Sequence, residues 1–328
     1  MFLIVEDIRK GGGRMALSTK GLMHLFVVYV VWSSTYLAIR VAVAPGSGFP
    51  PFLMGGTRMV LAGLILLALA AIGGHRLKMT KDEFIRTAIA GVLLWVGGNG
   101  LVVWAEQSAN SGFACLMVSS SPIWVAFINA VQARRLPSPL LIASLLLGFA
   151  GIGVLMAPAI MSGNAAEFSS GIALTLAAIS WAAGSVYQTR CPVSLETPVA
   201  SGYQHLISSL GFFLLALIFQ EPVPQPTTSA WAAWAYLVIF GSVLAFTSFV
   251  YSLRLLPINI AMTYAYVNPV LALFLGAWLL DEPITAWTIA GAVMVIVSVF
   301  GIFRDRYRQE QRQANADGAR QVASTSTE

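Results

Sequence analysis

Residues 138–157 read SPLLIASLLLGFAGIGVLMA and contain no charged side chain. A helix needs about 20 mostly apolar residues to cross the hydrocarbon core of a bilayer, and this run has that length. The paired arginines just before it, Arg134 and Arg135, place the preceding turn at a membrane surface, because charges inside the bilayer are costly. The stretch therefore predicts a transmembrane helix.

Ten runs of this kind fill most of the chain, with short breaks of turn-forming residues between them. They are 21–43, 51–72, 84–105, 113–133, 138–157, 171–190, 199–219, 231–253, 260–280 and 284–303. Over all 328 residues, 57% are hydrophobic and only 10% charged, whereas a soluble domain has about 25% charged residues. We predict an all-α integral membrane protein with ten transmembrane helices.

The positive charge is asymmetric across the predicted membrane. Apart from Arg40 and Arg58, which lie inside runs, every Lys and Arg lies in the segments on the same side as the N-terminus. The loops on the other side have none of either and hold Glu106, Glu167, Glu221, Asp281 and Glu282. Since Lys and Arg accumulate in cytoplasmic loops, both termini should be cytoplasmic. The net charge of +5 thus reflects topology and does not indicate a nucleic-acid partner.

The two ends of the chain lie outside the predicted spans. Residues 1–20 form a cytoplasmic segment whose apolar patch is too short for a signal peptide, and either Met1 or Met15 fits as the start. The tail 304–328 is polar, so we expect it to be disordered.

The two halves of the chain repeat. A shift of 147 residues places Pro51 on Pro198, Arg58 on His205, Trp104 on Tyr251, Ser121 on Asn268 and Pro122 on Pro269. A repeat over 21–157 and another over 171–303 hold five spans each, so the second crosses the membrane in the opposite sense. Inverted repeats around a central cavity are typical of secondary transporters, which bind substrate where the repeats meet.

Several motifs resemble one known family. The first span contains Val31-Trp32-Ser33-Ser34-Thr35-Tyr36 followed by Arg40, the second begins Phe49-Pro50-Pro51 ahead of Arg58, the fourth contains Ser120-Ser121-Pro122, and the ninth ends Leu279-Leu280-Asp281-Glu282-Pro283. In this order, over residues 20 to 303, they resemble the EamA family of the drug/metabolite transporter superfamily, and within it most the exporters of aromatic amino acids and methyl viologen. The resemblance implies a ten-helix basket in the bacterial inner membrane that exports amino acids or other small metabolites.

Few ionisable residues fall inside the spans, and none of them is acidic. The deepest are Arg58 and His205; Arg58 either serves the cavity or hydrogen-bonds helix ends, and His205 leaves the same choice open. Because proton-coupled carriers often use a buried carboxylate, we expect a carrier without such a relay. Two alternatives keep proton coupling open, through His205 or through Glu106 reaching into the cavity from a span end.

Aromatic and polar side chains at helical spacing predict the cavity wall, because residues four apart share a helix face. The candidate substrate-binding residues are Trp32, Tyr36, Trp95, Asn99, Met117, Ser121, Trp181, Ser185, Tyr264 and Asn268. Aromatic walls suit flat apolar substrates, although membrane tryptophans are also common as interface anchors. Pro122 and Pro269, which free backbone carbonyls, are candidate hinges.

We therefore predict a secondary transporter that exports amino acids, aromatic or large neutral ones included, and related small metabolites across the inner membrane by alternating access. The alternative within the same family is a proton-coupled efflux carrier for drugs and metabolites. An intramembrane enzyme would need a nucleophile–base pair or a metal set, and the sequence indicates neither; no metal or cofactor is expected. The expected partners are the small-molecule substrate and the lipid bilayer. A chain with both repeats is compatible with a monomer, and a dimer is equally open.

Overall fold

The computed structural model describes residues 18–133, 137–256, 258–261 and 263–325. The first half contains α2 (Thr19–Val43), α3 (Pro51–Ile72), α4 (Lys81–Gly91) continued by the π-helix η1 (Val92–Gly100) and α5 (Leu101–Ala105), α6 (Ser111–Val118) with α7 (Ser121–Ala133), and α8 (Pro139–Ser162). The second half contains α9 (Ala165–Arg190), α10 (Thr197–Ile218), α11 (Thr228–Tyr236) continued by the π-helix η2 (Leu237–Ala245) and α12 (Phe246–Leu255), α13 (Ile258–Ala261) with α14 (Tyr264–Leu280), and α15 (Ala286–Thr325).

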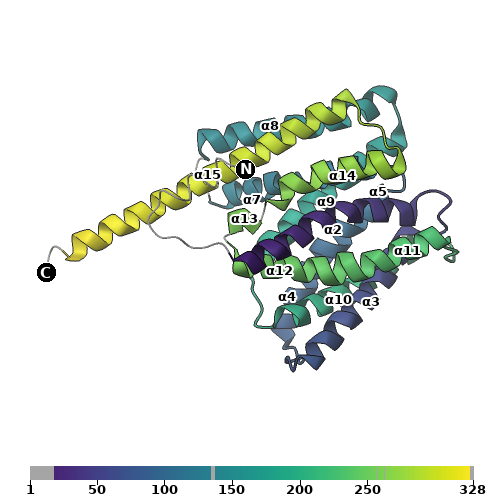
Figure 1. Cartoon of the computed structure of the whole chain (residues 1–328), viewed down its shortest axis with the longest axis horizontal. Helices are drawn as coiled ribbons and strands as arrows, with labels where there is room; N and C mark the ends of the chain where they lie inside the picture. Colours follow the sequence, from purple (N-terminus) through teal and green to yellow (C-terminus); the bar gives the residue numbers. More distant parts are fainter. Residues whose placement is uncertain (1–17, 134–136, 257, 262, 326–328) are drawn as a thin grey trace.

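These elements form ten spans (Figure 1). Within the described ranges, nine helices are long and apolar enough to cross a membrane, and Val267–Leu280 is a shorter apolar helix. The prediction of an all-helical, ten-span membrane protein is confirmed. Arg134 and Arg135, predicted to turn at the surface between the fourth and fifth spans, lie outside the described residues.

Helix ends follow local sequence signals. Ser138 caps α8 by accepting a hydrogen bond from the backbone N–H of Leu141 at 3.0 Å, and Pro139 follows at the first position, where its missing N–H costs nothing. The same helix ends at Gly163, whose φ of 66° is left-handed and suits a residue without a Cβ. Both ends of α8 thus follow from its sequence.

The tail differs from the prediction. The sequence predicts disorder from Arg304 on, whereas α15 continues as helix to Thr325 and extends beyond the rest of the bundle (Figure 1). The segment has no proline and is rich in Arg, Gln and Ala, all of them good helix formers. Low hydrophobicity therefore did not prevent this segment from continuing the last span.

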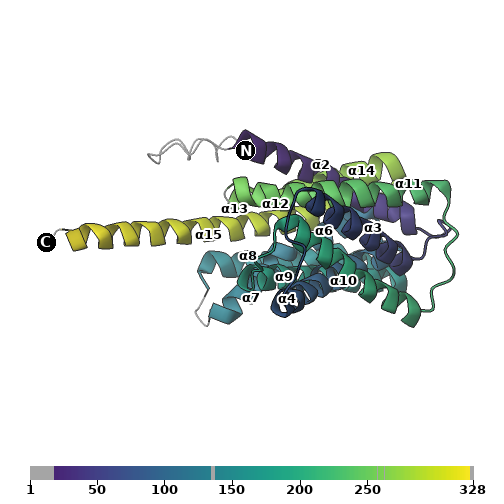
Figure 2. The same ribbon diagram turned by 90° about the horizontal axis from the view of Figure 1, so that it is seen from below.

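The two halves run in opposite senses. Arg40, near the end of α2, donates to the backbone carbonyl of Glu106, and Ser170, near the start of α9, donates to that of Ala105. The first span of one half therefore ends where the first span of the other begins. We call this the outer face, because its loops are those the sequence predicts to be outside. Repeat-equivalent helices also pair, α3 along α10 and α8 along α15 (Figures 1 and 2).

Glycines allow the paired helices to approach closely. A Cβ added to Gly63 on α3 would lie 2.9 Å from the carbonyl oxygen of Gly202 on α10, and one added to Gly291 on α15 would lie 3.1 Å from that of Gly151 on α8. Such contacts drive helix association in membranes, where lipid is as apolar as the side chains. The pairs hold the two halves together on either side of the centre.

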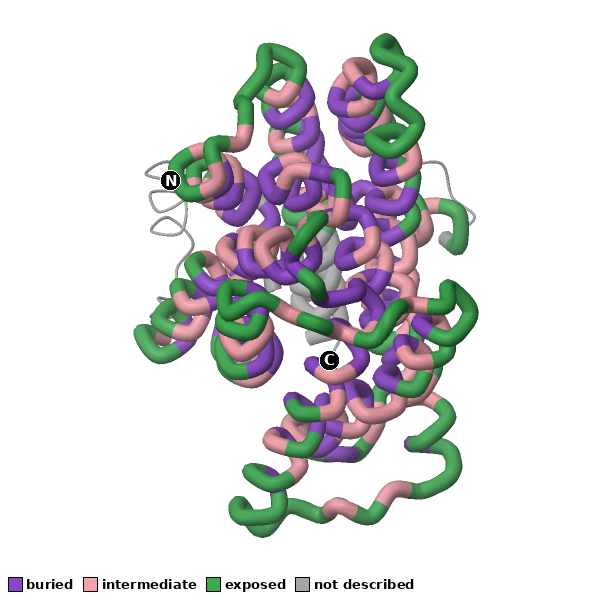
Figure 3. Tube along the Cα trace, turned by 90° about the vertical axis from the view of Figure 1, so that its right-hand side faces the viewer, coloured by how far each residue is buried: buried purple, intermediate pink, exposed green. Residues whose placement is uncertain are grey.

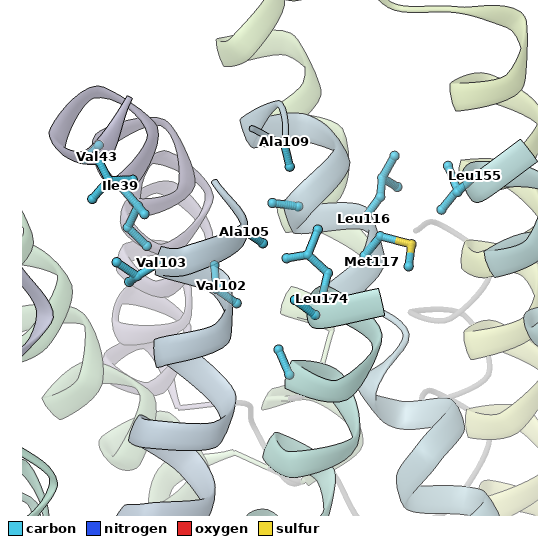
Figure 4. Packing of buried hydrophobic residues seen from close by; sticks show 14 of the residues in the cluster. Ile39, Val43, Val102, Val103, Ala105, Ala109, Leu116, Met117, Leu155 and Leu174 are labelled. Carbon is cyan, nitrogen blue, oxygen red and sulfur yellow. The ribbon is translucent and has the colours of Figure 1, made fainter. Parts of the chain in front are cut away.

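Buried positions lie toward the inside of the bundle, and exposed ones around its rim and in the loops (Figure 3). The main core brings together Ile39 of α2, Val103 of α5, Leu116 and Met117 of α6 and Leu174 of α9 (Figure 4). This core lies next to a cavity and fixes the helices that line it.

Candidate functional site

A cavity lies between α2, α3, the third and fourth spans, α9, η2 and α14. It is lined by Trp32, Thr35, Tyr36, Ile39, Arg58, Trp95, Gly98, Asn99, Val102, Cys115, Val118, Ser119, Ser121, Pro122, Ala177, Trp181, Gly241, Tyr264, Ala265 and Asn268. Both halves contribute, as expected for a site between inverted repeats. All the residues predicted from the sequence to line a cavity are present, except Met117 and Ser185.

The aromatic side chains form a continuous wall. The Trp32 ring meets that of Trp181 edge-on at 6.5 Å and that of Tyr264 at 5.2 Å, with interplanar angles of 89° and 84°. Trp95 meets Trp181 in the same way at 6.1 Å. Edge-to-face pairs are the favoured geometry for aromatic rings, so four spans from both halves hold one another's rings in place. Indole and phenol faces are available to a flat or cationic ligand.

Arg58 is a buried cation in this wall, with only 3% of its surface exposed. Its Nε donates to Ser242 Oγ at 3.0 Å and its Nη1 to Asn99 Oδ1 at 3.4 Å. It forms no salt bridge with a described residue, and its Nη2 makes no hydrogen bond to one. A guanidinium with free donors beside a cavity can bind a carboxylate in two-point fashion.

His205 packs behind the wall and does not line the cavity. Its ring lies 4.3 Å from that of Trp95, and Nδ1 lies 2.8 Å from the Ser201 carbonyl oxygen. That oxygen can only accept, so the proton is on Nδ1. Nε2 then faces no hydrogen-bond partner among the described residues. The contacts fit a residue with a structural role that packs against Trp95. The sequence left structural hydrogen bonding open for His205, beside a role in the cavity.

Two π-helices lie at equivalent places in the third span of each half. Trp95, Gly98 and Asn99 reach the cavity from η1, and Gly241 from η2. A π-helix shifts the hydrogen-bond ladder by one residue and often marks a functional site. Here the wider turns bring glycines and an amide against the cavity. No residue pattern in the sequence indicated them.

The two candidate hinge residues, Pro122 and Pro269, lie in different local structures. Ahead of Pro122 the fourth span breaks, because α6 ends at Val118 and α7 starts at Ser121, and Ser119, Ser121 and Pro122 all line the cavity. Pro269 lies inside α14, and the break in the ninth span precedes it, between α13 and α14. The repeat-equivalent prolines therefore do not mark equivalent breaks.

Two of the predicted lining residues lie elsewhere. Met117 is fully buried in the core beside Leu116 and Leu174, on the side of α6 that faces α8 and α9 (Figure 4). Ser185 lies one turn beyond Trp181, and its hydroxyl donates to the Trp181 carbonyl instead of facing the cavity. Of this pair, Trp181 lines the cavity and Ser185 does not.

A family comparison matches both halves separately, at residues 19–157 and 169–304, to the EamA-like transporter family. The chain belongs to the EamA-like transporter family. Each of the two matches covers one half of the chain.

Relatives of this EamA-like chain are transporters. It is 33% identical over 280 residues to the "Uncharacterized inner membrane transporter YedA" of Escherichia coli, covering 83% of this chain and 88% of that one. It is 22% identical to the "Uncharacterized transporter YoaV" of Bacillus subtilis, over 86% of this chain and 96% of that one. The "S-adenosylmethionine/S-adenosylhomocysteine transporter" of Chlamydia muridarum is also 22% identical, over 88% of this chain and 93% of that one.

A solved structure named "Crystal structure of protein" shares the fold. It superposes with a TM-score of 0.61 at 21% identity, over 87% of this chain and 96% of that one. The comparisons therefore show an EamA-like membrane transporter.

One prediction about this EamA-like cavity needs correction. The sequence places no acid inside a span, expects no buried carboxylate to serve as a relay, and mentions Glu106 only as an alternative at a span end. The structure buries Glu106 completely, at 0% exposure, just after α5. It lies four residues after Val102, which lines the cavity, so it continues the same helix face toward the outer face.

Arg40 has a structural role near this acid. Its Nη1 donates to the carbonyl oxygens of Glu106 and Gln107 at 2.6 and 2.7 Å, so it caps the C-terminal end of α5. Free carbonyls at a helix end need such donors, and a cation also suits the negative end of the helix dipole. This contact ties the end of α2 to the end of α5.

Proposed function

We propose that this EamA-like transporter exports aromatic and large neutral amino acids, and related small metabolites, from the cytoplasm by alternating access. The observation that carries the proposal is that one cavity holds both an aromatic wall and a buried cation that forms no ion pair within the described part of the chain. Arg58 supplies the cation, and Trp32, Trp181 and Tyr264 supply the wall.

The carboxylate of an amino acid is the group that Arg58 fits. A buried guanidinium without an acidic partner is costly, and a bound carboxylate offsets that cost. Ser242 and Asn99 hold the guanidinium by Nε and Nη1, which leaves Nη2 for the ligand. The site is therefore oriented before substrate arrives, which favours affinity.

The amino group and side chain of the substrate fit other residues of the cavity lining. Asn268 lines it, and its Oδ1 has no hydrogen-bond partner among the described residues. An ammonium group could donate to this oxygen and lie against indole or phenol faces. The rings of Trp32 and Trp181 then favour an aromatic side chain over a small one.

The experiment that tests this proposal is counterflow in proteoliposomes at equal pH on both sides. Vesicles loaded with unlabelled phenylalanine would take up labelled phenylalanine, and saturable uptake is the expected result. Phenethylamine, which lacks the carboxylate, should compete poorly against the wild type. In the Arg58→Gln variant, phenylalanine should lose its advantage over phenethylamine.

The matched control is His24→Gln, at the other end of the bundle, where the ring stacks on Tyr251 and lies 3.2 Å from Ser248 Oγ. This variant should preserve the preference for the carboxylate. Phenylalanine and phenethylamine competing equally against the wild type would contradict the assignment of Arg58.

The chlamydial relative suggests a second set of substrates. Its printed name gives S-adenosylmethionine and S-adenosylhomocysteine, which also join an aromatic ring to an amino acid carboxylate. Both should be included as competitors in the counterflow assay. Stronger competition by them than by phenylalanine would assign the aromatic wall to adenine.

A further inference from the structure

Glu106 is a buried acid whose carboxylate accepts no hydrogen bond from a described residue. None of its surface is exposed, and neither carboxylate oxygen has a hydrogen-bond partner among the residues that the structure describes. A charged carboxylate in such a place would lose its hydration without gaining a hydrogen bond from a described residue. By contrast, Glu221 and Glu282 at the same face each accept backbone N–H groups at helix starts, at 2.8 to 3.1 Å.

Glu106 lies next to residues that line the cavity. Val102, one turn before it, lines the cavity, as do Tyr36 of α2 and Cys115 of α6. Both of these titratable side chains lie near Glu106. Glu106 thus lies one layer outward of the cavity, between it and the outer face.

The charged and titratable groups that face Glu106 come from three elements. Helix α2 contributes Arg40 and Tyr36, α6 contributes Cys115, and the segment after α14 contributes Glu282. Arg40 donates from Nη1 to the backbone carbonyls of Glu106 and Gln107. Within the described part of the chain it forms no salt bridge with the Glu106 carboxylate. Helix α9 packs on α5 and brings Ser170, which does not titrate.

These surroundings favour the protonated acid. Burial raises the pKa of Glu106 well above its ordinary value, Glu282 raises it further, and Arg40 opposes both. Desolvation always disfavours the charged form of a carboxyl group. Water reaching the site would remove that effect and release the proton.

We propose that Glu106 is a proton-binding site coupled to the outer opening of the cavity: it holds a proton while the outer face is closed over it and releases that proton as the face opens. The coupling follows from position, since parting α2, α5 and α6 to open the cavity outward also hydrates the acid between them. External acid should therefore favour the closed outer face. The inference rests on the proposed function, because only a carrier opens in this way.

Cys115 provides a built-in reporter. It is fully buried and lines the cavity beside Glu106, so a membrane-impermeant maleimide added outside should reach it only when the outer face is open. The second cysteine, Cys191, would be replaced by serine in every variant. Labelling would be followed in right-side-out membrane vesicles across a range of external pH.

The thiol reacts faster at high pH for its own chemical reasons, so a reference is required. Ser108→Cys, in a background with both native cysteines replaced, places a thiol at an exposed position two residues after Glu106. Rates for Cys115 would be divided by rates for this reference. Glu167→Gln, an exposed acid of the same face, is the matched control for Glu106→Gln.

One proton per opening limits the effect to about tenfold for each pH unit. We expect the normalised labelling rate to fall on acidification by up to that factor in the wild type and in Glu167→Gln. It should be flat in Glu106→Gln, which keeps the shape of the protonated acid. Equal pH dependence in the wild type and Glu106→Gln, or none in the wild type, would overturn the proposal.

Infrared difference spectra give a second measurement that does not depend on labelling. The wild type at neutral pH should show a protonated carboxyl band that Glu106→Gln lacks, and identical spectra would also overturn the proposal. Neither measurement uses a substrate. Failed counterflow together with a Glu106-dependent response would remove the substrate class and keep the proton site.

Discussion

Arg58 and Ser242 join the two halves of the molecule at the cavity wall, through a hydrogen bond of 3.0 Å from Nε to Oγ. Arg58 lies seven residues into the second span, and Ser242 lies in the π-helix of the eighth. The contact fixes the direction in which the guanidinium points. Any motion of one half against the other must carry this bond along or break it.

Removing the bond should weaken substrate binding. In Ser242→Ala, Arg58 keeps its charge but loses an orienting partner worth about 1.5–3 kcal/mol, so KM for phenylalanine should rise by about tenfold or more. The measurement is saturable counterflow at several substrate concentrations. Ser252→Ala is the control, since this buried serine of the same span donates to the Phe249 carbonyl of its own helix, and KM should not change. Equal KM values in the two variants would contradict an orienting role.

The aromatic wall should select substrates by their side chains. Trp181→Ala removes the ring that contacts both Trp32 and Trp95. An aromatic contact is worth about 0.5–1.5 kcal/mol beyond the area that it buries, so competition by phenylalanine should weaken by about tenfold and competition by alanine much less. Trp278→Ala, at a ring that is 68% exposed, should leave both unchanged. A uniform loss for all amino acids would indicate a purely structural tryptophan.

Gly241 should be intolerant of a single methyl group. A Cβ at this position would lie 3.0 Å from Thr35 Cγ2 and 3.4 Å from Arg58 Nη2, the group proposed to receive the carboxylate. We expect Gly241→Ala to reduce transport strongly while the protein remains folded, as measured by counterflow beside size-exclusion chromatography. Gly153→Ala is the matched control, because nothing lies within 4 Å of its added Cβ. Normal transport by Gly241→Ala would argue that Nη2 does not hold substrate.

Much of this architecture follows from the sequence. Apolar run length fixes the ten spans, and the four-residue spacing of Trp32 with Tyr36 and of Tyr264 with Asn268 placed these side chains on cavity faces. The same spacing did not place Ser185 there, because a serine hydroxyl can instead donate to a carbonyl of its own helix.

Helical periodicity could not predict that Met117 packs in the core or that Glu106 is buried. On an apolar helix every face is hydrophobic, so the sequence does not distinguish the face of α6 that packs on α9 from the one that lines the cavity. Glu106 lies at a span end, where acids are normally hydrated. Only the packing of Arg40, Ser170 and Glu282 around the end of α5 reveals that water is excluded there.

Burial of Glu106 should also appear in the pH dependence of stability. Because burial raises its pKa in the folded protein above the unfolded value of about 4.3, the folded state holds a proton that the unfolded state releases over the intervening pH range. The wild type should therefore lose stability as pH rises through that range, by up to about 1.4 kcal/mol per pH unit. Glu106→Gln has no proton to hold, so its Tm in detergent should exceed that of the wild type by a margin that grows with pH. Glu167→Gln should show a constant offset, and parallel Tm curves for the wild type and Glu106→Gln would mean that the acid is hydrated in the folded protein.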